Sequence, residues 1–536
     1  MQQNNIGLSC PSCGDGESDA GGRLKLLRTL CISVLLTMPL FWDMRPVIQL
    51  VIATLLQFWP GQYFYKSAWE SLKQKILGMD FLVALSTTVI YIHSAYTVFT
   101  VHENVKLYFL SEGVLLSLIL FGRYMESTSK YEASEAIRKL IRLQPERANI
   151  IRDGIEMTAG IEDLKADDIV YIQSGERIPI DAVIIMGECE ADESMLSGES
   201  EAVCKRVGDR VYCGTLCRRG SIKLSCADIG KKTMLRQIID IVCSAQDEKA
   251  PIARFADKIA AVFVPVVIII SAAVFCLRYF WIDAGNLSSA VNCVCSILVI
   301  ACPCALGLAT PTSIMTGSGR AAELGVLFRG GEQLETAYKT TAVVFDKTGT
   351  LTLGLSEGEE QLREGAAVVV EELNKSGMEV WMISGDKKEK ADRIAGLLNI
   401  ENVLCEVKPQ DKADAVKKLQ AYGKRVCFVG DGINDSPALT CADIGIALGC
   451  GTDIAISAAD VMIVGNNLES IKTVFDISRA TMKNVRQNLI WALIYNIICI
   501  PLAAAGIINP SIAAAAMSLS SNGVLLNALR LKKYGK

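Results

Sequence analysis

Two aspartate-containing turns are the strongest candidates for chemistry in this sequence. The turn at 346–350, Asp-Lys-Thr-Gly-Thr, follows an apolar run, which places Asp346 to attack a phosphoryl group as a carboxylate nucleophile. The turn at 430–435 follows a second apolar run. Its Asp431 and Asp435 offer the hard oxygen ligands that Mg²⁺ requires where it bridges a phosphate. Either turn alone would suit a strand cap, but the pair favours a site at which phosphate is transferred to Asp346.

Other polar residues fit such a site. Ser384 ends a third strand-like run, two residues before Asp386, and its hydroxyl would hydrogen-bond phosphate oxygens, while Lys412 would neutralise developing negative charge. Alone, either would more often be part of a surface turn or a solvated lysine. In the polar turn at 197–200, Glu199 would position the water that hydrolyses an acyl phosphate. Together these residues predict a phosphoaspartate enzyme.

A second kind of chemistry lies in the apolar part of the chain. Pro303 stands between Cys302 and Cys304 in a charge-free stretch, and because proline breaks the helix hydrogen bonding, the helix must unwind there. The two thiolates would face a local cavity, where soft sulfur selects Cu(I) or another thiophilic metal. The alternative is two cysteines that pack as small hydrophobic side chains on a kinked helix. The last apolar stretches add a thioether and polar groups that need partners in lipid: Met517, Ser521, Tyr495 and Asn496.

The composition predicts an integral membrane protein with sizeable water-facing parts. Of the 536 residues, 51% are hydrophobic and only 21% are charged, and the mean hydropathy is +0.33, which is more apolar than expected for a soluble chain. The 54 basic residues are outnumbered by 58 acidic ones, so there is no electrostatic case for nucleic-acid binding. The 19 cysteines lack the spacing of a secreted disulfide scaffold, and we expect reduced thiols.

Charge-free stretches predict the membrane helices, because a charge in hydrocarbon costs several kcal/mol and a span needs about 20 apolar residues. The polar segments 123–258 and 320–486 are flanked by basic residues and are therefore expected in the cytoplasm. We expect eight helices, grouped four, two and two, at 24–42, 46–65, 81–102, 107–122, 259–277, 284–319 and, divided near 508–511, two within 487–529.

The two polar segments differ in pattern. The first has short β-branched runs bounded by Gly, Pro or Asp, which predict strands at 148–152, 168–173 and 182–186. The second alternates strand and helix patterns, which predicts a parallel sheet with its chemistry at the carboxyl ends of the strands. Its expected strands are 341–345, 379–383, 425–429 and 444–447.

From about Leu24 to its C-terminus, the chain resembles a heavy-metal-transporting P-type ATPase of the copper(I) branch. The motifs that carry the resemblance, in the family's order, are Cys302-Pro303-Cys304 with 307–311, 346–350, 430–435, Tyr495-Asn496 and 517–521. The resemblance implies a multi-pass α-helical membrane protein with eight helices, a β-rich cytoplasmic actuator domain and an α/β haloacid-dehalogenase-like phosphorylation domain. It also implies ATP-driven export of Cu(I), or of Ag(I), across the plasma membrane.

The resemblance implies a role for each matching residue. ATP with Mg²⁺ would phosphorylate Asp346, and Glu199 would assist dephosphorylation. Met79, Glu126 and Asp257 match positions that the family is thought to use where copper enters and leaves. The expected partners are the lipid bilayer and a copper chaperone that delivers the ion. The implied sites are catalytic (Asp346, Lys347, Thr348, Glu199, Ser384, Asp386, Lys412), magnesium-binding (Asp431, Asn434, Asp435) and copper-binding (Cys302, Cys304, Tyr495, Asn496, Met517, Ser521).

The chain departs from the family at one place in particular. Only 351–362 separate the phosphorylation motif from the next helical pattern, where the family has a nucleotide-binding domain of ordinary domain size, roughly 100 or more residues. The expected parts are a tail with one Cys-x-x-Cys pair (1–23), helices 1–4 (24–128), the actuator domain (129–250), helices 5–6 (251–325), the phosphorylation domain (326–482), and helices 7–8 with a C-terminal tail (483–536).

Three functions therefore stay open. The first is a copper-exporting ATPase, and the second is a copper-binding membrane protein that has lost catalysis with its nucleotide-binding domain. The third is a phosphoaspartate phosphatase fused to a membrane anchor. The third is disfavoured because a bare anchor would not need Cys302, Cys304, Met517 and Ser521 in its spans.

Overall fold

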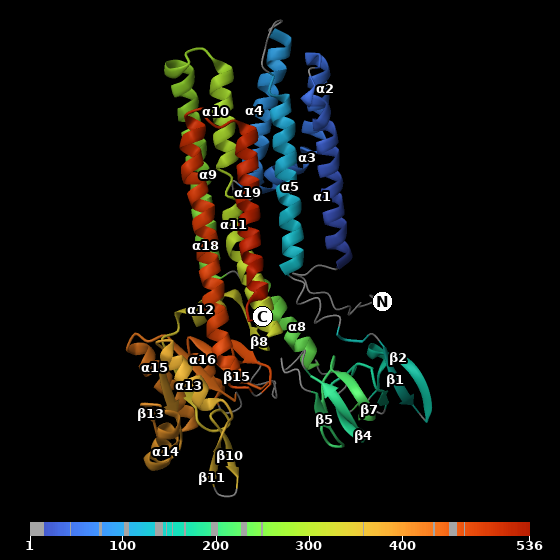
Figure 1. Ribbon diagram of the computed structural model, residues 1–536, viewed down its shortest axis with the longest axis vertical. Coiled ribbons are helices and arrows are strands. Elements are labelled where there is room, and N and C mark those ends of the chain that lie inside the picture. Colours follow the sequence, from blue (N-terminus) through green and yellow to red (C-terminus); the bar gives the residue numbers. More distant parts are fainter. Residues whose placement is uncertain are drawn as a thin grey trace.

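The structure, a computed structural model, has a helical bundle at one end and two separate domains at the other (Figure 1). It describes residues 16–42, 44–73, 78–100, 107–133, 143–145, 147–152, 154–165, 168–193, 202–226, 233–247, 250–356, 359–431, 435–449, 458–465 and 467–535. The bundle contains α1 (Gly16–Thr37), α2 (Pro46–Phe58), α3 (Gln62–Lys73), α4 (Met79–Thr100), α5 (Phe109–Ala133), α9 (Pro251–Leu277), α10 (Leu287–Ile300), α11 (Cys304–Glu323), α18 (Ser470–Ala504) and α19 (Pro510–Leu529).

Within the described residues, six helical segments are long and apolar enough to cross a membrane, so the expected count of eight is not confirmed. The six are Gly21–Phe41, Asp80–Thr100, Pro251–Ile282, Leu287–Glu323, Ser470–Ala504 and Pro510–Lys533. The expected span at 46–65 is wrong, because the chain turns at 59–61 and divides it into α2 and α3. Pro60 lacks an amide hydrogen, and a Cβ on Gly61 would lie 2.2 Å from the carbonyl oxygen of Gln57. The expected span at 107–122 corresponds to α5. This helix lies alongside the six (Figure 1) but is not among them, and it carries the charged residues Glu112, Arg123 and Glu126.

The predicted break at Pro303 is confirmed. Helix α10 ends at Ile300 and α11 begins at Cys304, with Pro303 at the position before its first turn. The 36-residue charge-free stretch is therefore two helices in line rather than one. The unwound residues lie in the bundle interior, where Ala301 and Cys302 are buried.

The first polar segment folds into an antiparallel sheet, with strands in the order β2-β1-β3-β7-β4-β5 and β6 paired to β4. Alternate residues of β3 and β7, such as Val170, Ile172 and Leu224, lie in its core. The three predicted strands are confirmed to within a residue or two, except that β4 continues six residues further. The elements are β1 (Arg147–Arg152), β2 (Ile155–Gly160), β3 (Ile169–Ile172), β4 (Ala182–Asp192), β5 (Val203–Lys205), β6 (Arg210–Val211), β7 (Leu216–Ser225) and α8 (Met234–Asp247).

The second polar segment folds into a seven-stranded sheet in the order β13-β12-β9-β14-β15-β16-β8, parallel except for β8. Its central strands are buried on both faces: Val343 and Phe345 of β9 face one apolar cluster and Val344 faces the other. The four predicted strands are confirmed. The strands are β8 (Val326–Phe328), β9 (Ala342–Asp346), β12 (Glu379–Ile383), β13 (Asn402–Leu404), β14 (Val426–Gly430), β15 (Ile444–Leu448) and β16 (Val461–Ile463). The helices are α12 (Gly331–Lys339), α13 (Ala366–Lys375), α14 (Lys388–Leu398), α15 (Lys412–Ala421) and α16 (Ser436–Cys441).

The close packing of α11 against α18 generates a stability prediction. A Cβ on Gly317 would lie 2.2 Å from Oγ1 and 3.1 Å from Cβ of Thr481, which is buried and cannot move aside. Gly317→Ala is therefore expected to destabilise the protein by about 1–3 kcal/mol through overpacking. Thermal unfolding of the purified protein in detergent measures the change.

Gly307→Ala on the same helix is the matched control. A Cβ there would meet nothing within 4 Å, and both substitutions raise helix propensity equally. An unfolding temperature that is equal in the two variants would contradict the close contact between α11 and α18.

Candidate functional site

Three neighbouring strands of the parallel sheet end at one edge, and this edge carries the predicted phosphorylation residues. Asp346 is the last residue of β9, Ser384 follows β12 and Asp431 follows β14, and both β12 and β14 pair with β9. Asp435 stands just before α16 and reaches the same edge. The sheet order therefore brings together residues that are far apart in the chain.

Lys412 joins the two central carboxylates. Its Nζ lies 2.7 Å from Oδ1 of Asp346 and 2.7 Å from Oδ1 of Asp435, and all three side chains are buried. Burial and the neighbouring Asp435 raise the pKa of Asp346, although the ammonium of Lys412 opposes the shift. In turn, the two carboxylates raise the pKa of Lys412 despite its burial. The arrangement holds one positive charge beside the candidate nucleophile.

Lys347 makes a second buried pairing beside Asp346. Its ammonium contacts the carboxylates of Asp386 and Glu360, and both raise its pKa against the effect of burial. The Ser384 hydroxyl donates to Oδ2 of Asp386 at 3.1 Å, so Asp386 holds both predicted groups in place. Thr348 is exposed at the mouth of the turn.

The acidic residues at this edge suit a hard cation such as Mg²⁺. Oδ2 of Asp435 is buried and accepts no hydrogen bond, so it has a lone pair available. Gly349 has a φ of +78°, and a Cβ there would lie 2.9 Å from Oδ2 of Asp431, so glycine leaves room for that carboxylate. In the described part of the chain, no three side chains of His, Cys, Asp or Glu are grouped closely enough to hold a metal ion. Asn434 and Glu199 lie outside the described residues.

A short hairpin lies at 352–362, where the resemblance noted in the sequence predicts that a nucleotide-binding domain is missing. Strands β10 (Thr352–Ser356) and β11 (Glu359–Leu362) pair antiparallel, directly after the phosphorylation motif. The hairpin supplies Glu360 to Lys347, and the following Arg363 donates to the carbonyl oxygen of Gly349. It is thus fastened to the phosphorylation site through two charged residues that the sequence analysis did not single out.

The predicted soft-metal residues lie on neighbouring helices in the bundle. Cys302 and Met517 belong to one buried cluster, and Tyr495 packs against it. The hydroxyl of Tyr495 donates to the carbonyl oxygen of Ala513 at 3.3 Å, while Oδ1 of buried Asn496 has no hydrogen-bond partner. The structure does not describe the side chain of Cys304.

The cysteines depart in part from the expectation of reduced thiols. Thirteen cysteines in the described part of the chain are free, whereas Cys243 on α8 and Cys302 between α10 and α11 each carry a disulfide bond. Binding of a soft cation by Cys302 therefore requires that its disulfide first be reduced.

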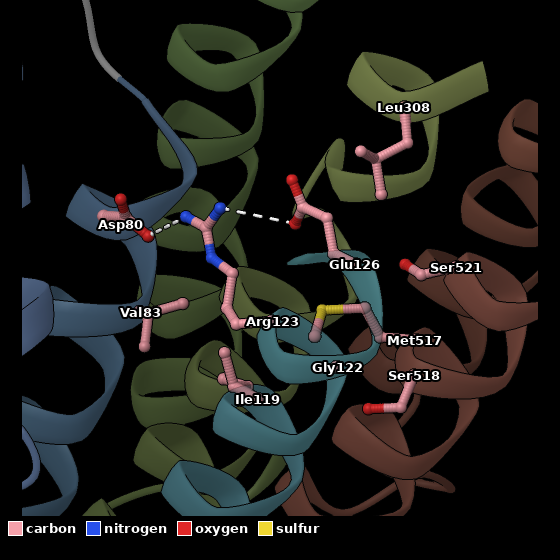
Figure 2. Close-up of a pocket in the computed structure, with 10 residues that line it drawn as sticks. All are labelled: Asp80, Val83, Ile119, Gly122, Arg123, Glu126, Leu308, Met517, Ser518 and Ser521. Carbon is pink, nitrogen blue, oxygen red and sulfur yellow. Dashed lines mark hydrogen bonds and ion pairs between the residues drawn. The ribbon is translucent and has the colours of Figure 1, made fainter. Parts of the chain in front are cut away.

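Of the three residues matched to copper access, only Glu126 is seen beside another predicted ligand. Glu126 lines a small pocket together with Met517 and Ser521 (Figure 2). Asp257 is exposed on α9 and is not among the residues that line this pocket, and the side chain of Met79 is not described.

Sequence analysis missed two charged residues of the same pocket. Asp80 and Arg123 form an ion pair there, and Arg123 also contacts Glu126. Charged residues next to apolar stretches were the available signal, because such residues need partners in or near lipid.

Comparisons with known proteins agree with this architecture. The P-type ATPase actuator domain matches residues 142–242, and the haloacid dehalogenase-like hydrolase family matches residues 353–443. A crystal structure of a zinc-transporting PIB-type ATPase in the E2.Pi state aligns with a TM-score of 0.56 and 24% identity, covering 96% of this chain and 99% of that one. At this identity the likeness shows the fold alone.

Curated relatives are similar over most of the chain. The copper-exporting P-type ATPase of Bacillus subtilis (strain 168) is 36% identical, covering 98% of this chain and 83% of that protein. The probable copper-transporting ATPase PacS of Synechocystis is 37% identical over 91% of this chain and 83% of that protein. The probable copper-importing P-type ATPase A of Enterococcus hirae is 37% identical over 91% and 82%.

The alignment with the Bacillus protein extends over 667 positions, more than the 536 residues of this chain, so that relative contains segments that this chain lacks. The actuator and hydrolase matches fall on the two water-facing domains, and the relatives agree over most of both chains. The chain therefore belongs to the heavy-metal-transporting P-type ATPases.

Proposed function

We propose that this protein exports Cu(I), or the chemically similar Ag(I), from the cytoplasm across the plasma membrane, driven by transfer of phosphate from ATP to Asp346. The observation that carries the proposal is the buried cluster of Asp346, Lys412 and Asp435 at the edge of the parallel sheet. The copper-transporting relatives support the choice of ion. The domain boundaries expected from the sequence are part of this proposal.

The proposed reaction begins at the Asp346 carboxylate. One carboxylate oxygen attacks the γ-phosphorus of ATP, an O–P bond forms, and the P–O bond to the ADP leaving group breaks. The ammonium of Lys412 and the hydroxyl of Ser384 stabilise the negative charge that develops on the phosphoryl oxygens, with Lys347, Thr348 and Asp386 positioning the group. Glu199 positions the water that later hydrolyses the acyl phosphate.

Asp431, Asn434 and Asp435 are the residues that would hold Mg²⁺ beside Asp346. When bound, Mg²⁺ neutralises phosphate charge and orients the phosphoryl group. The buried lone pair on Oδ2 of Asp435 supports this assignment.

The proposed ion path combines soft ligands and polar groups within the bundle. Reduced Cys302 and Cys304 with the thioether of Met517 select a soft monovalent ion, and the other donors are Tyr495, Asn496 and Ser521. Glu126 and Met79 receive the ion on the cytoplasmic side, where a copper chaperone delivers it. Asp257 is the third residue of the proposed path by which copper enters and leaves.

The hairpin in place of a nucleotide-binding domain bears on how ATP reaches Asp346. Contacts to the nucleotide contribute positioning, which in general is worth several kcal/mol of a reaction barrier. The second candidate function, a copper-binding membrane protein with impaired catalysis, rests on this observation.

The first prediction of this proposal concerns phosphorylation. Purified protein with [γ-³²P]ATP, Mg²⁺ and Cu(I) is expected to form acid-stable protein-bound label. Asp346→Asn should abolish the label, because an amide is not a nucleophile. Lys412→Met should lower it at least about tenfold, since the charge that stabilises the transferred phosphoryl group is lost. Lys417→Met, an exposed lysine on the same helix, should leave it unchanged.

Labelling with ³²P-phosphate separates the two candidate functions. Label from phosphate but not from ATP would mean an intact aspartate site without effective nucleotide delivery, which is the impaired alternative. Label that persists in Asp346→Asn would overturn the assignment of the nucleophile.

The second prediction concerns the thiols. After reduction, Cys302→Ala is expected to lower the Cu(I) bound at saturation by about one ion per protein, because the soft site loses a thiolate. Cys295→Ala removes a buried free thiol from α10 and is the matched control. It is expected to leave the amount of bound Cu(I) unchanged. Equal loss in both variants, measured by metal analysis after dialysis, would refute the metal assignment.

A further inference from the structure

The pocket at the cytoplasmic end of the bundle contains a guanidinium between two carboxylates (Figure 2). Nη2 of Arg123 on α5 lies 2.5 Å from Oδ1 of Asp80 on α4, and Nη1 lies 3.4 Å from Oε2 of Glu126. The three side chains are only 18%, 11% and 14% exposed. Asp80 also accepts a hydrogen bond from Ser67 of α3.

Arg123 and Glu126 line two cavities. The inner one, about 20 Å³, is lined by Met517 and Ser521 together with apolar side chains. The outer one, about 620 Å³, is lined by residues of α1, α3 and α5, including Lys25 of α1 and Lys66 of α3. Both cavities have Arg123 and Glu126 in their walls. Arg123 and Glu126 are therefore the side chains that the two cavities have in common.

The size and the donors of the inner cavity suit one small ion without its water shell. A volume of about 20 Å³ holds roughly one water-sized particle. The thioether of Met517 is a soft ligand, the Ser521 hydroxyl is a neutral oxygen ligand, and the carboxylate of Glu126 supplies charge (Figure 2).

The charge of this pocket discriminates between ions of different valence. Of its ten lining residues only Asp80, Arg123 and Glu126 are charged, which leaves a formal charge of −1. A monovalent cation makes the pocket neutral, whereas a divalent cation leaves an uncompensated positive charge. In a site with little water, an uncompensated charge costs several kcal/mol.

The two contacts of Arg123 differ in a way that permits exchange. The shorter contact to Asp80 keeps the guanidinium in place, while the longer contact to Glu126 is the one that an arriving cation can replace. A cation that replaced this contact would lie in the cavity that Glu126 and Met517 both line.

We propose that Arg123 is a specificity-determining residue, which with Asp80 sets the charge of the inner pocket so that it admits monovalent soft cations and rejects divalent ones. The proposal rests on the proposed function, because it assumes that the ion passes Glu126.

The test measures the affinities of Ag(I) and Zn(II) for the full-length reduced protein by equilibrium dialysis. It uses a Cys302→Ser/Cys304→Ser background, so that the paired thiols do not contribute. Arg123→Gln makes the pocket charge −2 and is expected to raise the Zn(II) affinity at least about tenfold, with a smaller gain for Ag(I). Arg123→Lys keeps the charge and should keep the parent's ratio of Ag(I) to Zn(II) affinity.

The double variant Asp80→Asn/Arg123→Gln decides between charge and structure. It restores the charge of −1 and is expected to return the affinity ratio to that of the parent, although both members of the ion pair are gone. A purely structural role of Arg123 would instead impair the double variant as much as the single one. An unchanged ratio in Arg123→Gln, or one not restored in the double variant, overturns the proposal. Because the background lacks both thiols, this result is separate from that of the Cys302 experiment.

Discussion

The buried ammonium of Lys412 between Asp346 and Asp435 is the interaction on which the rest of the phosphorylation site depends. Two carboxylates this close cannot both stay ionised out of water unless a cation lies between them. Lys412 supplies that cation in this structure. The strand order β12-β9-β14 and the short helix α16 bring the two carboxylates to one edge of the sheet, where Lys412 contacts both.

The same constraint governs the membrane end of the protein. Arg123 is held by Asp80 and Glu126 for the reason that Lys412 is held by its two aspartates: a charge with little access to water needs a partner. Each cluster joins two carboxylates through one basic side chain.

Continuous helices connect the two ends. Helix α18 has 35 residues, which corresponds to roughly 52 Å, and runs from the phosphorylation domain into the bundle (Figure 1). Near the N-terminus of α18, the hydroxyl of Ser478 donates to the carbonyl oxygen of Leu334 in α12. Closer to its C-terminus, α18 carries Tyr495 and Asn496. Its close contact with α11 at Gly317 ties it to the helix that begins at Cys304. One helix thus joins the phosphorylation domain to the part of the bundle that contains the candidate metal ligands Tyr495 and Asn496 (Figure 1).

The sequence by itself determined the kinds of chemistry and the local structure around them. Apolar runs predicted the strands that end at Asp346, Ser384 and Asp431, and Pro303 predicted the break between α10 and α11, because these features depend on neighbouring residues. Only the tertiary structure decided the partners: Lys412 is 66 positions from Asp346, and Arg123 is 43 from Asp80. It also fastened the hairpin to Lys347 through Glu360. Such pairings join residues that no local pattern relates, since they arise from the packing of elements that are distant in the chain.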